Sequence, residues 1–197
     1  MALVDIAGHT IETDLIGDGI IIDIGCRGFE FSNYFTTHHP KNGVVCVDPD
    51  LEVFRNRIAG HNQMWYNVAI AATAGESAIY RNGEATCLKE IDPDQSHEFT
   101  PCRTITMADL YQVTGKNVDV LKLDCEGAEY IILGETFEPV PKQISVEFHY
   151  HCVPELHNAN YPGIIERLLK DYDIKTNAWE ERHGCGYNFW DVLFVRK

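Results

Sequence analysis

Two apolar, strand-like segments of this 197-residue chain carry charged side chains where a buried strand should be apolar. Lys122 and Asp124 stand two residues apart in the first segment, and Glu147 and His149 stand two residues apart in the second. Residues two apart in a strand point to the same face, and an isolated buried charge is costly. We therefore expect these groups to be paired with one another or used in chemistry.

If the two strands are neighbours, Lys122 can pair with Glu147. Asp124 and His149 then lie at the carboxyl ends of the strands, where open α/β sheets bind their ligands. Glu126 and Glu129 follow Asp124 closely and add two carboxylates to this edge. The alternative to a ligand-binding site is a network of ion pairs that only stabilises the fold.

A glycine-containing turn after an earlier apolar segment predicts a second part of the same edge. Gly25 permits a tight turn that a ligand can approach, and Gly28 is expected to let the next helix pack close to the strand. The amino end of that helix then presents its N–H groups to the ligand. The expected cofactor contacts of this turn are Asp23, Gly25, Cys26, Arg27 and Gly28.

The acidic residues around this turn favour a positively charged cofactor. Asp48 and Pro49 end the next strand, where a carboxylate can accept both hydrogens of a ribose diol. Asp23 replaces the first glycine of the dinucleotide fingerprint and would repel a pyrophosphate. It would suit the ammonium and sulfonium groups of S-adenosylmethionine, so we favour this cofactor over NAD. The alternative is that Asp23 and Asp48 only cap helices.

The third strand of the predicted sheet ends in Asn67, Val68 and Ala69. In this architecture that edge lies beside the adenine, which a backbone amide and the Asn67 side chain could bind. Ordinary strand packing explains the same residues equally well.

The alternation of short apolar segments with helix-like segments predicts an α/β fold. We expect a mostly parallel sheet with helices on both faces and an antiparallel last strand. The predicted strands are 20–24, 43–47, 64–70, 118–123, 144–148 and 191–195, and the predicted helices are 29–38, 51–59, 128–134 and 163–171. Residues 75–104 interrupt this rhythm with extended pieces and a polar loop, as a lid, a substrate loop or a surface insertion would.

Composition places further bounds on the function. The formal net charge of −14 disfavours nucleic acid and anionic membranes as partners. Seven cysteines without a C-x-x-C pair indicate a reducing compartment. We see neither a signal peptide nor a membrane-spanning segment, so we expect a cytoplasmic protein in which residues 1–197 form one domain. The oligomeric state stays open.

The motifs, taken in order, resemble the FkbM-type methyltransferase family. The segment from Lys122 to Glu129 looks like its K-x-D-x-E-G-x-E strand end, and Arg103–Leu110 looks like its T-x-D-x-L segment. Residues 21–28 resemble its cofactor loop, and Glu147–His149 its E-x-H strand end. The resemblance implies a Rossmann-like class I methyltransferase fold with a seven-stranded sheet, S-adenosylmethionine as methyl donor, and hydroxyl groups of small metabolites as acceptors.

Methyl transfer to an alcohol requires that a proton be removed. We expect His149 to be the general base, oriented by Glu147 or Glu126, with Asp124 lining the methyl site. We assign no metal ligands, because zinc fits the His and Cys spacing poorly; Mg²⁺ or Ca²⁺ held by Asp124, Glu126 and His149 is the metal-dependent alternative. A nicotinamide-dependent oxidoreductase and a non-catalytic cofactor-binding module are the alternatives from other classes.

Overall fold

The computed structural model describes most of the chain. The described residues are 2–55, 57–82, 85–88, 99–115, 117–134, 140–150, 154–182 and 187–197. In this part of the chain, no helix combines the length and the apolar character that crossing a membrane requires.

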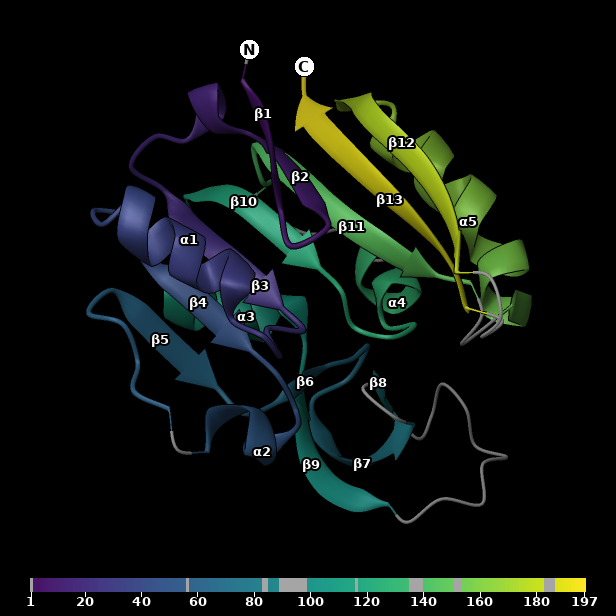
Figure 1. Ribbon diagram of the computed structural model, residues 1–197. Helices are drawn as coiled ribbons and strands as arrows, with labels where there is room; N and C mark the ends of the chain where they lie inside the picture. Colours follow the sequence, from purple (N-terminus) through teal and green to yellow (C-terminus); the bar gives the residue numbers. More distant parts are fainter. Residues whose placement is uncertain are drawn as a thin grey trace.

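The central sheet has seven strands (Figure 1). They are, in spatial order, β12 (Tyr172–Arg182), β13 (Tyr187–Arg196), β11 (Gln143–His149), β10 (Val118–Leu123), β3 (Ile20–Ile24), β4 (Val44–Val47) and β5 (Gln63–Tyr66). The five strands from β11 to β5 pair in parallel, and β13 pairs antiparallel with both of its neighbours. The expectation of a mostly parallel sheet with an antiparallel last strand is confirmed.

The order in which the strands are added to the sheet reverses between β3 and β10. The chain runs outward from β3 through β4 to β5, and later outward from β10 through β11 on the other side. In open α/β sheets the ligand binds in the crevice beyond the carboxyl ends of the strands at such a reversal. The fold therefore places a ligand site where Gly25 and Asp124 follow adjacent strands.

Alternating strand residues pack into two separate cores, one on each face of the sheet. One face, with Ile22, Leu121 and Val146, is covered by α3 (Met107–Thr114), α4 (Glu129–Gly134) and α5 (Pro154–Leu168). The other face, with Ile21 and Val120, is covered by α1 (Glu30–His38), α2 (Leu51–Phe54) and a hairpin. Helices on both faces were expected, and the hairpin was not.

That hairpin is made by β1 (Leu3–Ile6) and β2 (His9–Glu12), and a short 3-10 turn, η1 (Thr13–Leu15), follows it. Ala7 and Gly8 form its two-residue turn with positive φ angles of 53° and 88°, as tight hairpin turns require. It lies across β11 and β13 (Figure 1). The Gln143 side chain binds both backbone groups of Glu12, at 2.8 and 3.0 Å, so the hairpin is fixed to the sheet.

A second, four-stranded sheet contains β6 (Ala69–Ile70), β7 (Gly75–Asn82), β8 (Ala85–Leu88) and β9 (Thr100–Ile105). The predicted single strand 64–70 is wrong, because the chain leaves the central sheet after Tyr66 and joins this second sheet at Ala69. The extended pieces predicted at 77–81 and 102–105 are confirmed within β7 and β9. The polar loop predicted around Gly83 and Pro93 lies outside the described residues.

Two predicted helix boundaries differ from the structure. The helix expected over 51–59 ends at Phe54, and Asp50 caps its start by accepting the N–H of Glu52. The helix expected over 163–171 begins at Pro154 and contains Pro162. The predicted helix starts directly after Pro162 because proline disrupts a helix interior, but α5 continues through this residue.

Candidate active site

Gly25 brings the ends of β3 and β10 together. Its φ of +80° is a left-handed conformation, and a Cβ built on it would lie 1.6 Å from the carbonyl oxygen of Asp124. The N–H of Gly25 donates to Val47 O at 2.9 Å, and the N–H of Asp124 donates to Ile24 O at 3.1 Å. Only glycine allows this approach. At Gly28, in contrast, a Cβ would meet the Glu30 side chain, so close helix packing does not explain that glycine.

Lys122 occupies the centre of the edge and does not pair with Glu147 as predicted. Its ammonium lies 3.2 Å from Asp23 and 3.2 Å from Asp124, and it donates to Gly25 O at 2.6 Å. The register explains the difference, because Lys122 stands opposite Asp23 on β3 and opposite Ser145 on β11. Burial alone would lower the pKa of Lys122, but the two carboxylates outweigh burial and raise it.

Asp23 is fully buried and accepts a hydrogen bond from the Ser32 hydroxyl in α1. It does not cap α1, whose N-cap is Phe29. Asp124 is one third exposed at its side chain. Burial alone would raise the pKa of Asp124, but Lys122 and two nearby histidines outweigh burial and hold it well below its usual range. Of these two carboxylates, only Asp124 therefore faces the crevice as an accessible charge.

Asp48 ends β4 on the cofactor side of the edge. It is 5% exposed, and burial raises its pKa to about 6 even though it accepts the N–H of Asp50 at 2.9 Å. The side chain of Asn67 donates to Asp48 O at 3.0 Å. Asn67 thus joins the ends of β4 and β5, and the amide hydrogen used there is not available to a ligand.

The remaining predicted cofactor residues are divided between surface and core. Cys26 is buried under α1, so that only its backbone could meet a ligand. Arg27 is exposed and donates to Thr86 of the second sheet at 3.3 Å. Pro49 and Val68 are half-buried beside Asp48 and Asn67, whereas Ala69 belongs to the core of the second sheet.

His149 lies at the end of β11 and is surrounded by carboxylates. Its Nδ1 is 3.0 Å from Glu129, and its Nε2 is 3.1 Å from Glu147 and 3.6 Å from both Asp124 and Glu126. The edge therefore does bring the four predicted catalytic residues together. Burial alone would lower the pKa of His149, but the carboxylates, Glu129 first, raise it well above its usual value. The surrounding carboxylates therefore favour the protonated form of this imidazole.

Glu129 organises the loop that follows β10, a role that the sequence did not reveal. It is fully buried and accepts the N–H groups of Cys125 and Gly127 at 2.7 and 2.8 Å, besides contacting His149. Glu126 and Gly127 in this loop both have positive φ angles, 51° and 102°. A non-glycine residue in this conformation is strained, and such strain clusters at functional sites.

His9 reaches the same cluster from the β1–β2 hairpin. Its Nδ1 is 3.3 Å from the Ser145 hydroxyl, and its Nε2 is 3.5 Å from Asp124. Sequence reasoning missed His9 because it lies 115 positions before Asp124. The available signal was the Ala7–Gly8 pair between two alternating segments, which is a pattern typical of a hairpin.

Sequence and structure comparisons agree with this geometry. Residues 23–187 match the methyltransferase FkbM domain, and no curated protein matches the chain. A fibrillarin–Nop5p complex aligns with a TM-score of 0.53 at 12% identity, covering 92% of this chain and 74% of that chain. The Methanococcus jannaschii fibrillarin pre-rRNA processing protein aligns with a TM-score of 0.55 at 10% identity, covering 100% and 83%.

These two solved structures show the fold alone, and it is the class I methyltransferase fold. The domain match spans most of the chain, including the Gly25 turn and the charged ends of β10 and β11. The chain therefore belongs to the FkbM methyltransferase family and is an S-adenosylmethionine-dependent methyltransferase.

Proposed function

We propose that this enzyme transfers the methyl group of S-adenosylmethionine to a hydroxyl group of a small molecule. The observation that carries the proposal is the cluster of His149 with four carboxylates at the carboxyl ends of β10 and β11. A hydroxyl group is a weak acid, so its methylation requires a group that accepts its proton. This cluster supplies such groups next to the predicted cofactor position.

The residues on the β3–β4 side fit the cofactor. The Gly25 turn stands at the carboxyl end of β3, and Asp48 at the end of β4 offers a carboxylate to the ribose diol. Asp124 adds an accessible negative charge that suits the sulfonium. We propose that the backbone from Gly25 to Gly28 holds the amino acid end and that the ends of β4 and β5 hold the nucleoside.

The reaction is an in-line displacement in which the C–S bond of the cofactor breaks as the acceptor oxygen binds the methyl carbon. Our sequence hypothesis named His149 as the base, but both of its ring nitrogens face carboxylates. We therefore propose Glu126 as the proton acceptor. Its side chain is 21% exposed, and its carboxylate lies 3.6 Å from Nε2 of His149. His149 then positions the carboxylates and balances their charge.

A small molecule suits the charge of the protein better than RNA does. Thirty acidic residues stand against sixteen Lys and Arg residues, and such an excess repels a phosphate backbone. Five of the seven cysteines lie in the described part of the chain and form no disulfide there, which supports the reducing, cytoplasmic location that we propose.

We further propose that residues 1–197 form one methyltransferase domain and that the excursion at 75–104 covers the cofactor. Two contacts support this arrangement. Arg27 of the cofactor turn donates to Thr86, and Arg81 forms an ion pair with Asp50 two residues beyond Asp48. The second sheet is therefore tied to both predicted cofactor loops.

Calorimetric titration with S-adenosylmethionine and, separately, NADH tests the cofactor assignment. We expect selective binding of S-adenosylmethionine, weakened in Asp48→Ala and unchanged in Asp171→Asn, an exposed acid in the turn between α5 and β12. Binding of NADH alone would favour the oxidoreductase.

Release of S-adenosylhomocysteine with panels of hydroxylated metabolites, amines and RNA tests the acceptor. We expect turnover with a hydroxylated metabolite. Glu126→Gln should lower kcat by about 10²- to 10⁴-fold, the usual contribution of a general base, with unchanged cofactor affinity. Turnover only with RNA or amines would contradict the proposed acceptor, and cofactor binding without any turnover would favour a non-catalytic module.

A further inference from the structure

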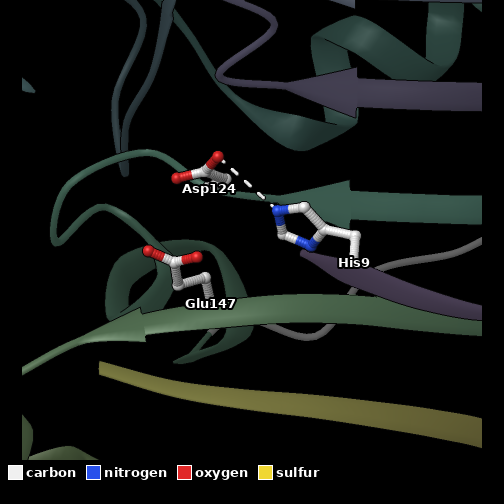
Figure 2. Close-up of side chains that lie close together, drawn as sticks. All are labelled: His9, Asp124 and Glu147. Atoms are coloured by element: carbon white, nitrogen blue, oxygen red, sulfur yellow. Dashed lines mark ion pairs between the residues drawn. The ribbon is translucent and has the colours of Figure 1, made fainter. Parts of the chain in front are cut away.

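One buried nitrogen at the edge has no hydrogen-bond partner. His9 is only 3% exposed, and its Nε2 neither donates nor accepts a hydrogen bond. The ring is oriented by the contact of Nδ1 with Ser145, so that Nε2 points at Asp124 from 3.5 Å (Figure 2). Leaving a buried polar group without a partner is costly, which indicates that something absent from the protein alone completes this contact.

His149 differs from His9 in this respect. Its Nδ1 hydrogen-bonds to Glu129, and its Nε2 lies 3.1 Å from Glu147. Protein carboxylates therefore account for both of its ring nitrogens. Of these two histidines, His9 is therefore the one with a ring nitrogen that lacks a hydrogen-bond partner.

The charges around His9 are not balanced. In the described part of the chain, the carboxylates of Asp23, Asp124, Glu126, Glu129 and Glu147 are in contact with three groups that can carry positive charge, Lys122, His149 and His9 itself. Excess negative charge at a largely buried position attracts a cation. The methyl donor carries positive charge, but it is expected over β3 and β4, whereas Ser145 and Glu147 belong to β11 on the other side of β10.

We propose that His9 Nε2 and the carboxylates of Asp124 and Glu147 bind one divalent metal ion. Ligand atoms of these three residues all lie within 4.8 Å of one another. Ligands about 2.1 Å from a shared ion stand about 3 to 4.2 Å apart, so small side-chain shifts complete the site. One imidazole and two carboxylates suit Mn²⁺ or Zn²⁺. Ser145 holds the second ring nitrogen, as partners of metal-binding histidines commonly do.

Figure 2 shows that the three ligands come from three separate elements, namely the hairpin, the end of β10 and β11. The ion would therefore fix the hairpin over the acceptor side of the edge. This inference rests on the proposed function and extends it. A dication at this position can bind the acceptor hydroxyl and make it a stronger acid, with the proton passing to Glu126. Occupancy of the site is measured without cofactor or acceptor, so the two proposals can fail separately.

The test is titration of the full, chelator-treated chain with Mn²⁺, followed by electron paramagnetic resonance of the free ion. We expect one Mn²⁺ per chain. His9→Gln and Glu147→Gln should each weaken binding at least about tenfold, and Ser145→Ala, which removes only the orienting hydroxyl, by about 10- to 100-fold. Competition with Zn²⁺ and Mg²⁺ then ranks the ions.

Two controls separate this site from its neighbours. Glu126→Gln removes a ligand of the other possible set, Asp124 with Glu126 and His149, and should leave Mn²⁺ affinity unchanged. His61→Ala removes an exposed histidine elsewhere and should also have no effect. Thermal unfolding in chelator identifies any variant that fails to fold. If a ligand variant does not fold, the loss of Mn²⁺ affinity in Ser145→Ala is the deciding measurement.

Absence of bound Mn²⁺ and Zn²⁺ in the wild-type chain would overturn the proposal. Wild-type affinity in a folded His9→Gln variant, or loss of binding in Glu126→Gln, would overturn it as well by placing the ion on the other set. Metal binding without S-adenosylmethionine binding would contradict the cofactor site alone.

Discussion

An acid stands near each end of strand β10, and the two acids have different partners. At the amino end, Asp119 is fully buried and accepts the N–H groups of Gly17 and Gly19 at 2.7 and 3.0 Å, with Lys142 at 2.6 Å. At the carboxyl end, Asp124 is one third exposed, and its carboxylate contacts the ionisable side chains of Lys122, His9 and His149.

The difference separates a structural charge from a functional one. Backbone donors hold Asp119 in one place and leave it no contact with a ligand. The partners of Asp124 can gain or lose protons, and its exposed side chain can still meet a ligand. A buried charge therefore indicates chemistry when its partners are titratable side chains at an accessible edge, and indicates folding when they are backbone amides.

The largest expected effect comes from removing the cation at the carboxyl end, with the same change at the amino end as the comparison. Lys122→Met leaves Asp23 and Asp124 without their shared partner, and should lower the free energy of unfolding by about 3 to 5 kcal/mol. Lys142→Met should cost about 1 kcal/mol or less, because Lys142 is 40% exposed and Asp119 keeps its backbone donors. Urea unfolding measures both values. Equal losses would remove the distinction between the two ends.

Gly25→Ala should also destabilise the carboxyl end strongly. The left-handed conformation costs about 1 to 2 kcal/mol for a residue with a Cβ, and the clash with Asp124 O adds to it, so we expect about 3 kcal/mol or more in all. Gly115→Ala is the matched control, because Gly115 has a φ of +95° and nothing within 4 Å of its Cβ position. If both variants lose the same stability, the close approach at Gly25 is unimportant.

Replacing each acid by its amide should separate stability from function. Asp119→Asn should lower the free energy of unfolding by about 1 to 3 kcal/mol with normal cofactor binding and turnover. Asp124→Asn should abolish most turnover with a smaller loss of stability. Chemical denaturation and release of S-adenosylhomocysteine are the two measurements. A loss of turnover in folded Asp119→Asn would show that both ends serve the reaction.

A smaller effect is expected on the cofactor side of the edge, where the ionisation of Asp48 should make the affinity for S-adenosylmethionine depend on pH. Burial raises its pKa to about 6, and its ionised form accepts both ribose hydroxyl hydrogens better than its protonated form. Affinity for S-adenosylmethionine should therefore fall as the pH drops below 6, by about tenfold per unit, or about 1.4 kcal/mol. Calorimetry between pH 5 and pH 8 measures it. The dependence should disappear in Asp48→Asn, and its persistence there would assign it to another group.

Much of the scaffold could be predicted because buried parallel strands are short apolar runs. The predicted segments 20–24 and 118–123 coincide with β3 and β10, and the charges on β10 and β11 share a face as their spacing indicated. The partner of Lys122 could not be predicted, because it depends on register between strands distant in sequence. The strand at 64–70 was wrong because its break at Asn67 depends on a contact with Asp48.

The sequence by itself determined the alternation of strands and helices that builds the parallel part of the central sheet, the glycine turn and the charged strand ends, because these follow from local patterns of two or a few residues. Only the tertiary structure decided that Lys122 joins Asp23 to Asp124, that Glu129 holds the loop after β10, and that His9 completes the cluster. These contacts join residues through the packing of distant elements. Local patterns specify the elements, whereas their register and the hairpin's position specify which charges meet.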